Sequence, residues 1–182
     1  MLNRWSGVTL IELMVGMVIV SCLLLVGMPS FTSWIQDLQV RGAAESIQSG
    51  LMLARSEAIR RNRPVQLVLA DAGGLVEWRV GCVSVEPDCP LSIMERKRGE
   101  GGLNARMAAP AVPPVEGAGT AAALVAGAGL PVNIAFNGLG QLAGPAPGWI
   151  ELSHVRLGSE RRLLVRIDAG LARICKPQEH CA

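Results

Sequence analysis

The sequence predicts an α+β protein in which a long N-terminal hydrophobic helix, first transmembrane and then amphipathic, packs on a globular domain with an antiparallel β-sheet. Three observations predict this fold. Residues 8–28 are apolar apart from Glu12, apolar residues recur at three- and four-residue steps over 29–63, and short alternating runs separated by turn residues occupy 64–182. Short sequential strands joined by tight turns favour antiparallel pairing.

The segment 8–28 has the length of a membrane crossing. Its 21 residues would span about 31 Å as a helix, against a hydrocarbon core of about 30 Å. Arg4 precedes it and favours a cytoplasmic amino terminus. A cleaved signal peptide and a lipoprotein signal at Cys22 are the alternatives. Glu12 inside the run, and the apolar residues after Cys22, argue against both.

The residues around Gly7 form a specific motif. Gly7 and a hydrophobic residue are followed by Thr-Leu-Ile-Glu-Leu, and Pro29 lies further on. This pattern resembles the start of type IV pilin-like proteins, with Val8 where phenylalanine is usual. The resemblance implies that residues 1–7 are a leader, that a prepilin peptidase cuts between Gly7 and Val8, and that Val8 becomes an N-methylated terminus.

Glu12 places a negative charge in the apolar run. Insertion of a carboxylate into a bilayer costs about 2.5–3.5 kcal/mol of free energy on insertion scales, so we expect Glu12 to pair with an opposite charge. The resemblance implies that Glu12 docks the subunit by pairing with the amino terminus of a neighbour, which offsets the desolvation cost. The alternative is a carboxylate that snorkels to the membrane interface.

An amphipathic helix over 29–63 is expected to continue the first segment, with Pro29 kinking or loosening it. A loop rich in Ala, Gly and Pro is predicted at 108–131. About 50 residues follow it, too few for an independent core, so we expect one domain over 64–182. The predicted strands are 64–69, 75–82, 91–94, 132–136, 149–157, 162–167 and 171–175.

Four of the five cysteines fall as two local pairs, Cys82 with Cys89 and Cys175 with Cys181. A domain in the bacterial periplasm meets oxidising conditions in which disulfides form. Four cysteines allow three connectivities, and the local pairing is the one that we expect. Cys22, inside the apolar run, has no evident partner.

Nothing in the residue pattern indicates catalysis. The sequence lacks a Ser-His-Asp arrangement and a metal-ligand cluster, and the glycines of 117–129 lack the helix-opening pattern of a phosphate loop. A zinc site that combines cysteines with His154 or His180 is the sharper alternative to disulfides, but the spacing does not favour it. We therefore expect that the protein is not an enzyme and that it binds no metal and no cofactor.

Three further segments are similar to the family of the minor pilin FimT and the pseudopilin GspH. They are 43–62, with its Ala-Arg-Ser-Glu-Ala-Ile run, 136–140 and 170–177. The resemblance implies a minor type IV pilin, with a pseudopilin of type II secretion as the alternative. The Arg-Ile-Cys-x-Pro stretch near the C-terminus favours the type IV pilin over the pseudopilin.

The resemblance also implies partners and a location. The implied partners are other pilin or pseudopilin subunits, the prepilin peptidase and an inner-membrane assembly platform. The implied location is a single inner-membrane pass with a periplasmic C-terminal domain.

The C-terminal region is basic. Six basic residues between 156 and 176 stand against Glu160 and Asp168, a local net charge of +4 on a chain of +2. Such charge is typical of sequence-independent phosphate contacts. Some FimT-like proteins are associated with DNA uptake through a GRxR motif, whose first arginine is Leu171 here. The alternatives are a solvated sheet face and pairing with neighbouring subunits. The candidate DNA contacts are Arg156, Arg161, Arg162, Arg166, Arg173 and Lys176.

Overall fold

The computed structural model describes residues 8–70, 73–98, 100, 104–110, 125–154 and 162–176, and of 26–30 and 33 it describes the backbone alone. The chain forms two compact units, Met1–Gln36 and Asp37–Ala182. The predicted leader with Gly7, much of the predicted loop at 108–131, and the candidate residues Arg156, Arg161 and Cys181 lie outside the described residues.

The helix α1 (Leu10–Arg61) includes both predicted helical segments and is continuous at Pro29. Thr9 caps its start, because the Thr9 hydroxyl accepts a hydrogen bond from the Glu12 amide at 3.3 Å. Asn62 ends it with a left-handed φ of 50°. In the described part of the chain, no helix combines the length and the apolar character that a bilayer crossing requires.

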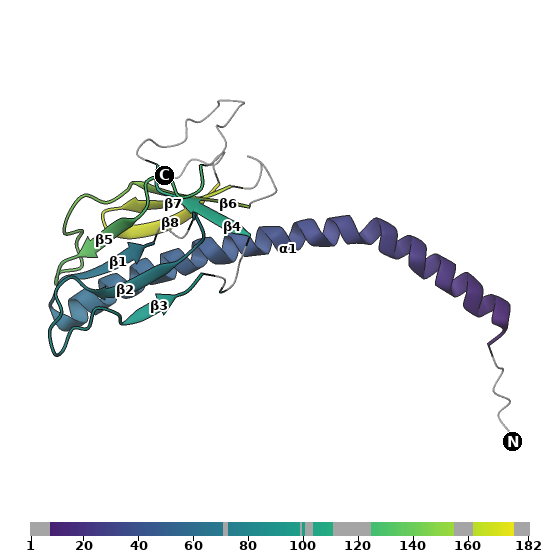
Figure 1. The fold of residues 1–182 in the computed structure, drawn as a ribbon, viewed down its shortest axis with the longest axis horizontal. Helices are drawn as coiled ribbons and strands as arrows, with labels where there is room; N and C mark the ends of the chain where they lie inside the picture. Colours follow the sequence, from purple (N-terminus) through teal and green to yellow (C-terminus); the bar gives the residue numbers. More distant parts are fainter. Residues whose placement is uncertain are drawn as a thin grey trace, which may run out of the picture. The chain divides into compact units, whose positions relative to one another are not determined.

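Two antiparallel sheets, where one was expected, follow α1 in the described residues. The first has the order β3-β2-β1-β5 and the second the order β4-β6-β7-β8. The strands are β1 (Val65–Leu69), β2 (Trp78–Cys82), β3 (Met94–Arg96), β4 (Ala105–Ala108), β5 (Val132–Phe136), β6 (Trp149–His154), β7 (Leu163–Asp168) and β8 (Leu171–Cys175). Figure 1 shows these strands around the half of α1 that belongs to the second unit.

The strand predicted at 91–94 begins later, at Met94. Residues 90–93 still follow β2, since the Cys82 amide donates to the Pro90 carbonyl at 3.0 Å and the Ile93 amide to the Val80 carbonyl at 2.8 Å. The backbone of Leu91 lies very close to Gly81. A Cβ on Gly81 would lie only 1.7 Å from the Leu91 carbonyl oxygen. Regular pairing therefore starts only after this close approach.

Small residues let α1 lie close to the first sheet. A Cβ on Gly50 would stand 3.0 Å from Leu67 Cδ1 and 3.5 Å from the Trp78 ring. The Trp78 indole also donates to Ser46 Oγ at 3.4 Å. The buried face of α1 is accordingly rich in alanine, and its members are Val40, Ala43, Ala44, Ile47, Leu51, Ala54 and Ala58. This narrow face packs against aliphatic side chains from both sheets.

The disulfide Cys82–Cys89 confirms one of the two predicted local pairs, with a Cα–Cα distance of 5.6 Å. Cys175 is also disulfide-bonded. Because Cys181 lies outside the described residues, its pairing with Cys175 stays a prediction. Cys22 is an exposed free thiol.

Candidate functional site

The first turn of α1 holds the residues of the N-terminal motif that the structure describes. Val8, Leu10 and Ile11 are exposed. Glu12 lies in the first turn, where backbone amides and the positive end of the helix dipole favour a carboxylate. Thr9 and Glu12 have the Thr-x-x-Glu spacing of a capping box. The motif thus sets the start of the helix, whatever else Glu12 binds.

The three segments that resemble the FimT and GspH family meet near the end of α1. Gln48 donates from Nε2 to the Ala172 carbonyl at 2.8 Å. One turn or more further along the helix, Arg55 donates from Nη1 to the Gly170 carbonyl at 3.5 Å. These two side chains bind carbonyls at the start of β8, so the helix holds the edge strand of the second sheet.

The loop after β5 completes this junction. A Cβ on Gly138 would lie 2.4 Å from Asn62 Oδ1, and one on Gly140 would lie 2.7 Å from Ile59 Cδ1 and 3.1 Å from Arg55 Nε. Asn137 shapes the loop, since its Oδ1 accepts from the amides of residues 139 and 141, both at 3.0 Å. The family-like residues at this junction therefore pack the helix against the loop and β8.

Two of the candidate basic residues lie on β7 and β8 of the second sheet. Arg166 on β7 and Arg173 on β8 are directly paired across the strands, and Lys176 follows β8. The Arg166 guanidinium lies over the Trp149 ring at 5.3 Å from its centroid and 3.6 Å from Asp168 Oδ2. A cation held over an indole keeps a defined position. Trp149 was not singled out from the sequence, and only its register with Arg166 reveals its role.

Arg162 has a different environment from the other candidate DNA contacts. Its Nη1 lies 2.8 Å from Glu151 Oε1, and the two side chains are only 6% and 8% exposed. A guanidinium buried in such a pair is held by its carboxylate partner and is not presented to a ligand. Of the four candidates within the described residues, Arg166 and Arg173 are paired on neighbouring strands, and Lys176 is exposed just after β8.

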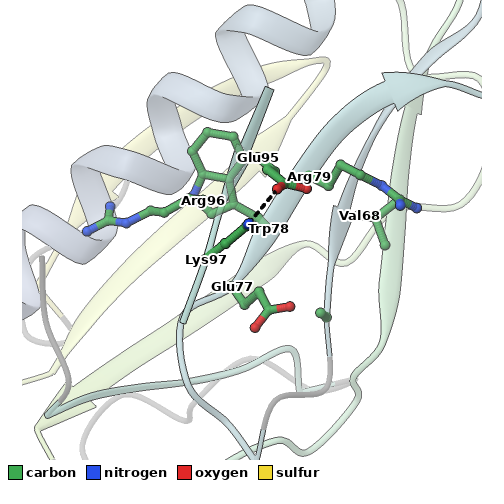
Figure 2. Close-up of a pocket in the computed structure, with 8 residues that line it drawn as sticks. Val68, Glu77, Trp78, Arg79, Glu95, Arg96 and Lys97 are labelled. Carbon is green, nitrogen blue, oxygen red and sulfur yellow. Dashed lines mark ion pairs between the residues drawn. The ribbon is translucent and has the colours of Figure 1, made fainter. Parts of the chain in front are cut away.

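A pocket of about 200 Å³ opens on the first sheet, over Val68 and Ala70. Figure 2 shows Glu77, Arg79 and the Glu95–Lys97 ion pair around it, and that pair has an N–O distance of 3.4 Å. Burial lowers the pKa of Arg96 at its edge, although Glu100 opposes the shift. Within the described ranges, no group of His, Cys, Asp and Glu residues could hold a metal ion.

A long helix whose alanine-rich face packs on antiparallel strands is the architecture of pilin-like subunits. A family model described as type II transport protein GspH matches residues 43–170, and the chain belongs to this family. The predicted family is thereby confirmed. It comprises minor pilins and pseudopilins, which are structural subunits of pilus and pseudopilus assemblies and not enzymes.

Among solved structures, the chain is similar to the type IV minor pilin FimU of Pseudomonas aeruginosa in two crystal forms. One match has 14% identity and a TM-score of 0.49, and covers 77% of this chain and 90% of the crystallised FimU chain. The other has 15% identity and a TM-score of 0.47, and covers 76% and 94%. No curated protein matches the sequence.

Proposed function

We propose that this chain is a minor type IV pilin of the FimT kind, which assembles with other pilin subunits into a pilus or initiates one. The match of residues 43–170 to the GspH family carries the part of the proposal that makes the chain a pilin-like subunit. The packing of the three family-like segments adds support: Gln48 and Arg55 bind carbonyls of 170–177, and the loop with Gly138 and Gly140 packs against the end of the same helix. The Arg-Ile-Cys-x-Pro stretch after Ala172 favours the pilus.

A pseudopilin of a type II secretion system is the second candidate, and the description of the matching family favours it. Deletion of the gene separates the two functions. Loss of twitching motility and of surface pili, with normal secretion of exoproteins, is the result expected of a minor pilin. Loss of secretion with normal twitching would reject the pilus and support the pseudopilus.

The proposal includes processing and anchoring of the N-terminal segment. The prepilin peptidase removes residues 1–7, and the helix from Val8 onward holds the subunit in the inner membrane until assembly. The exposed apolar side chains of residues 8–25 support this role. Mass spectrometry of the chain from cells with the peptidase should find a methylated Val8 terminus. Cells that lack the peptidase should yield the chain with residues 1–7. An uncleaved chain in both strains would contradict the proposal.

The proposal also includes a weak contact with duplex DNA through Arg166, Arg173 and Lys176. Arg166 and Arg173 are paired on the last two strands of the second sheet, Lys176 follows β8, and the Arg166 guanidinium lies over the Trp149 ring. Phosphate contacts of this kind are independent of sequence and sensitive to salt. Arg156 and Arg161 stay candidates, whereas Arg162 is engaged with Glu151.

A fluorescence titration with duplex DNA at low salt tests this contact. The double variant Arg166→Ala with Arg173→Ala should bind more weakly, and its salt slope should fall by about 2. The control is the double variant Arg79→Ala with Arg98→Ala, which removes the same charge from the first sheet and its neighbouring turn. Equal losses in both variants, or no binding by the unaltered chain, would reject a contact at this face.

A further inference from the structure

The disulfide loop between Cys82 and Cys89 lies against the end of α1. Both cysteines are buried, and they close a loop with a sequence separation of 7. Inside the loop, the Glu86 amide donates to the Cys89 carbonyl at 3.1 Å, and the Cys89 amide donates to the Glu86 carbonyl at 2.9 Å. The disulfide and this reciprocal pair give the loop a defined shape.

Arg61, the last residue of α1, and Arg63 bind this loop. Arg61 donates from Nη1 to the Asp88 carbonyl, and from Nε to Glu57 Oε2 at 2.8 Å. Arg63 donates from Nη1 to Glu86 Oε1 at 3.2 Å, and its Nη2 lies 3.1 Å from Glu86 Oε2. A two-point contact of guanidinium with carboxylate fixes orientation as well as distance.

The backbone adds a further connection. The Val83 amide donates to the Pro64 carbonyl at 3.1 Å. Residues 61–64 are thus joined to the loop at three separate points, through Arg61, Arg63 and Pro64. The end of α1 itself closes with two backbone hydrogen bonds, since the amides of Asn62 and Arg63 donate to the carbonyls of Ile59 and Ala58, both at 3.2 Å.

These arginine contacts depend on a loop that is already ordered. The Arg63 and Glu86 side chains are 55% and 40% exposed, and an exposed ion pair gains little once the entropy of holding both side chains is subtracted. A covalent cross-link removes most of the freedom of the loop beforehand. The Asp88 carbonyl is a backbone group, so its position depends entirely on the shape of the loop.

We propose that the Cys82–Cys89 disulfide is a redox-controlled clamp on the end of α1. When a dithiol–disulfide oxidant takes two electrons and two protons from the two thiols, the S–S bond forms and the oxidant becomes a dithiol. The closed loop then binds Arg61 and Arg63 and fixes the last turn of the helix. A dithiol reductant reverses the step, is itself oxidised to a disulfide, and releases that turn.

Hydrogen exchange on the full chain in detergent micelles tests the clamp. On reduction, protection of the Asn62 and Arg63 amides should fall by about fivefold to tenfold, because these amides close the end of the helix. The Val165 and Ile167 amides in β7 serve as internal references and should not change. Since the reductant also opens the disulfide of Cys175, the measurement is repeated with Cys175→Ser.

A variant keeps the test independent of the cysteines. Arg61→Ala with Arg63→Ala, in the oxidised chain, should lower protection at residue 62 as much as reduction does, and reduction should then add little. Arg41→Ala is the matched control, because it removes an exposed arginine whose partner is Glu45 on the same helix. Protection that does not change on reduction would overturn the clamp. So would a loss of protection on reduction that is as large in the double variant as in the unaltered chain, because the two effects would then be independent.

Discussion

Arg162 and Glu151 form a buried ion pair, and removal of one partner leaves the other charge without its compensation. Arg162→Ala should therefore lower the free energy of unfolding by about 3–5 kcal/mol, a typical loss when a buried pair is broken. Urea unfolding followed by circular dichroism measures the change. The double variant Glu151→Leu with Arg162→Leu should recover most of the stability, because neither charge is then buried. A single variant as stable as the unaltered chain would contradict the role assigned to this pair.

Glu57 connects stability to pH. Its hydrogen bond with Arg60, aided by Arg61 and opposed by burial, lowers the pKa of the Glu57 carboxyl below its ordinary value of 4.5. A carboxyl whose pKa is lower in the folded chain adds stability above pH 4.5, and this contribution is lost as the pH falls through the folded-state pKa.

The free energy of unfolding of Glu57→Gln should therefore fall less steeply than that of the unaltered chain as the pH decreases below 4.5. Thermal unfolding of both proteins over a series of acidic buffers measures the difference. Glu45→Gln is the control, since Glu45 is half-exposed at the side chain and pairs with one arginine on its own helix. The same pH profile for Glu57→Gln and the unaltered chain would show that this carboxyl is not coupled to folding.

At the scale of elements, the glycines after β5 set how closely the loop approaches α1. Gly140 has a φ of +74°, and a Cβ there would lie 2.7 Å from Ile59 Cδ1. Gly140→Ala should lower stability by about 1–3 kcal/mol, from backbone strain and overpacking together. Gly144→Ala is the matched control, since no heavy atom lies within 4 Å of its added Cβ. Differential scanning calorimetry should find a lower Tm for the first variant alone, and equal Tm values would reject the close approach.

The local pattern of the sequence was sufficient to predict many of the helices and strands, but not to predict how the strands pair into sheets. Alternation of apolar residues predicts the strands at 65–69, 132–136 and 171–175 within a residue or two, because one face of each is buried. Ala105–Ala108 was missed, since its two alanines, arginine and methionine have little preference for strands. The division into two sheets depends on pairing between distant segments, which local patterns do not record.

The candidate site shows the same limit. The cluster of basic residues near the C-terminus is visible in the sequence, but the burial of Arg162 is not, because its partner Glu151 belongs to another strand. The position of Trp149 under Arg166 likewise follows from the register of β6 and β7. Residue type thus indicated the chemistry of the region, and tertiary pairing decided which side chains remain near the surface.

At the scale of the whole molecule, the family match and the N-terminal motif belong to different parts of the chain. The match covers 43–170, whereas Val8 and Glu12 precede it. The proposed function therefore assigns separable properties to the two units, with the identity of the subunit in the globular unit and its processing and assembly in the first unit. A substitution in the first unit should impair assembly while the second unit stays folded.

Glu12→Ala tests this separation. If the proposed processing holds, the variant should still be cleaved between Gly7 and Val8, because both residues are intact, and Cys82–Cys89 should still form in the globular unit. It should fail to enter filaments, because the amino terminus of a neighbouring subunit then lacks its opposite charge in an apolar surrounding. Immunoblots of sheared filament fractions, compared with whole-cell fractions, measure incorporation. Glu45→Ala is the control, as it removes an exposed carboxylate from the same helix and should assemble normally. Normal incorporation of Glu12→Ala would show that the carboxylate serves only the first turn of α1, where Thr9 caps the helix.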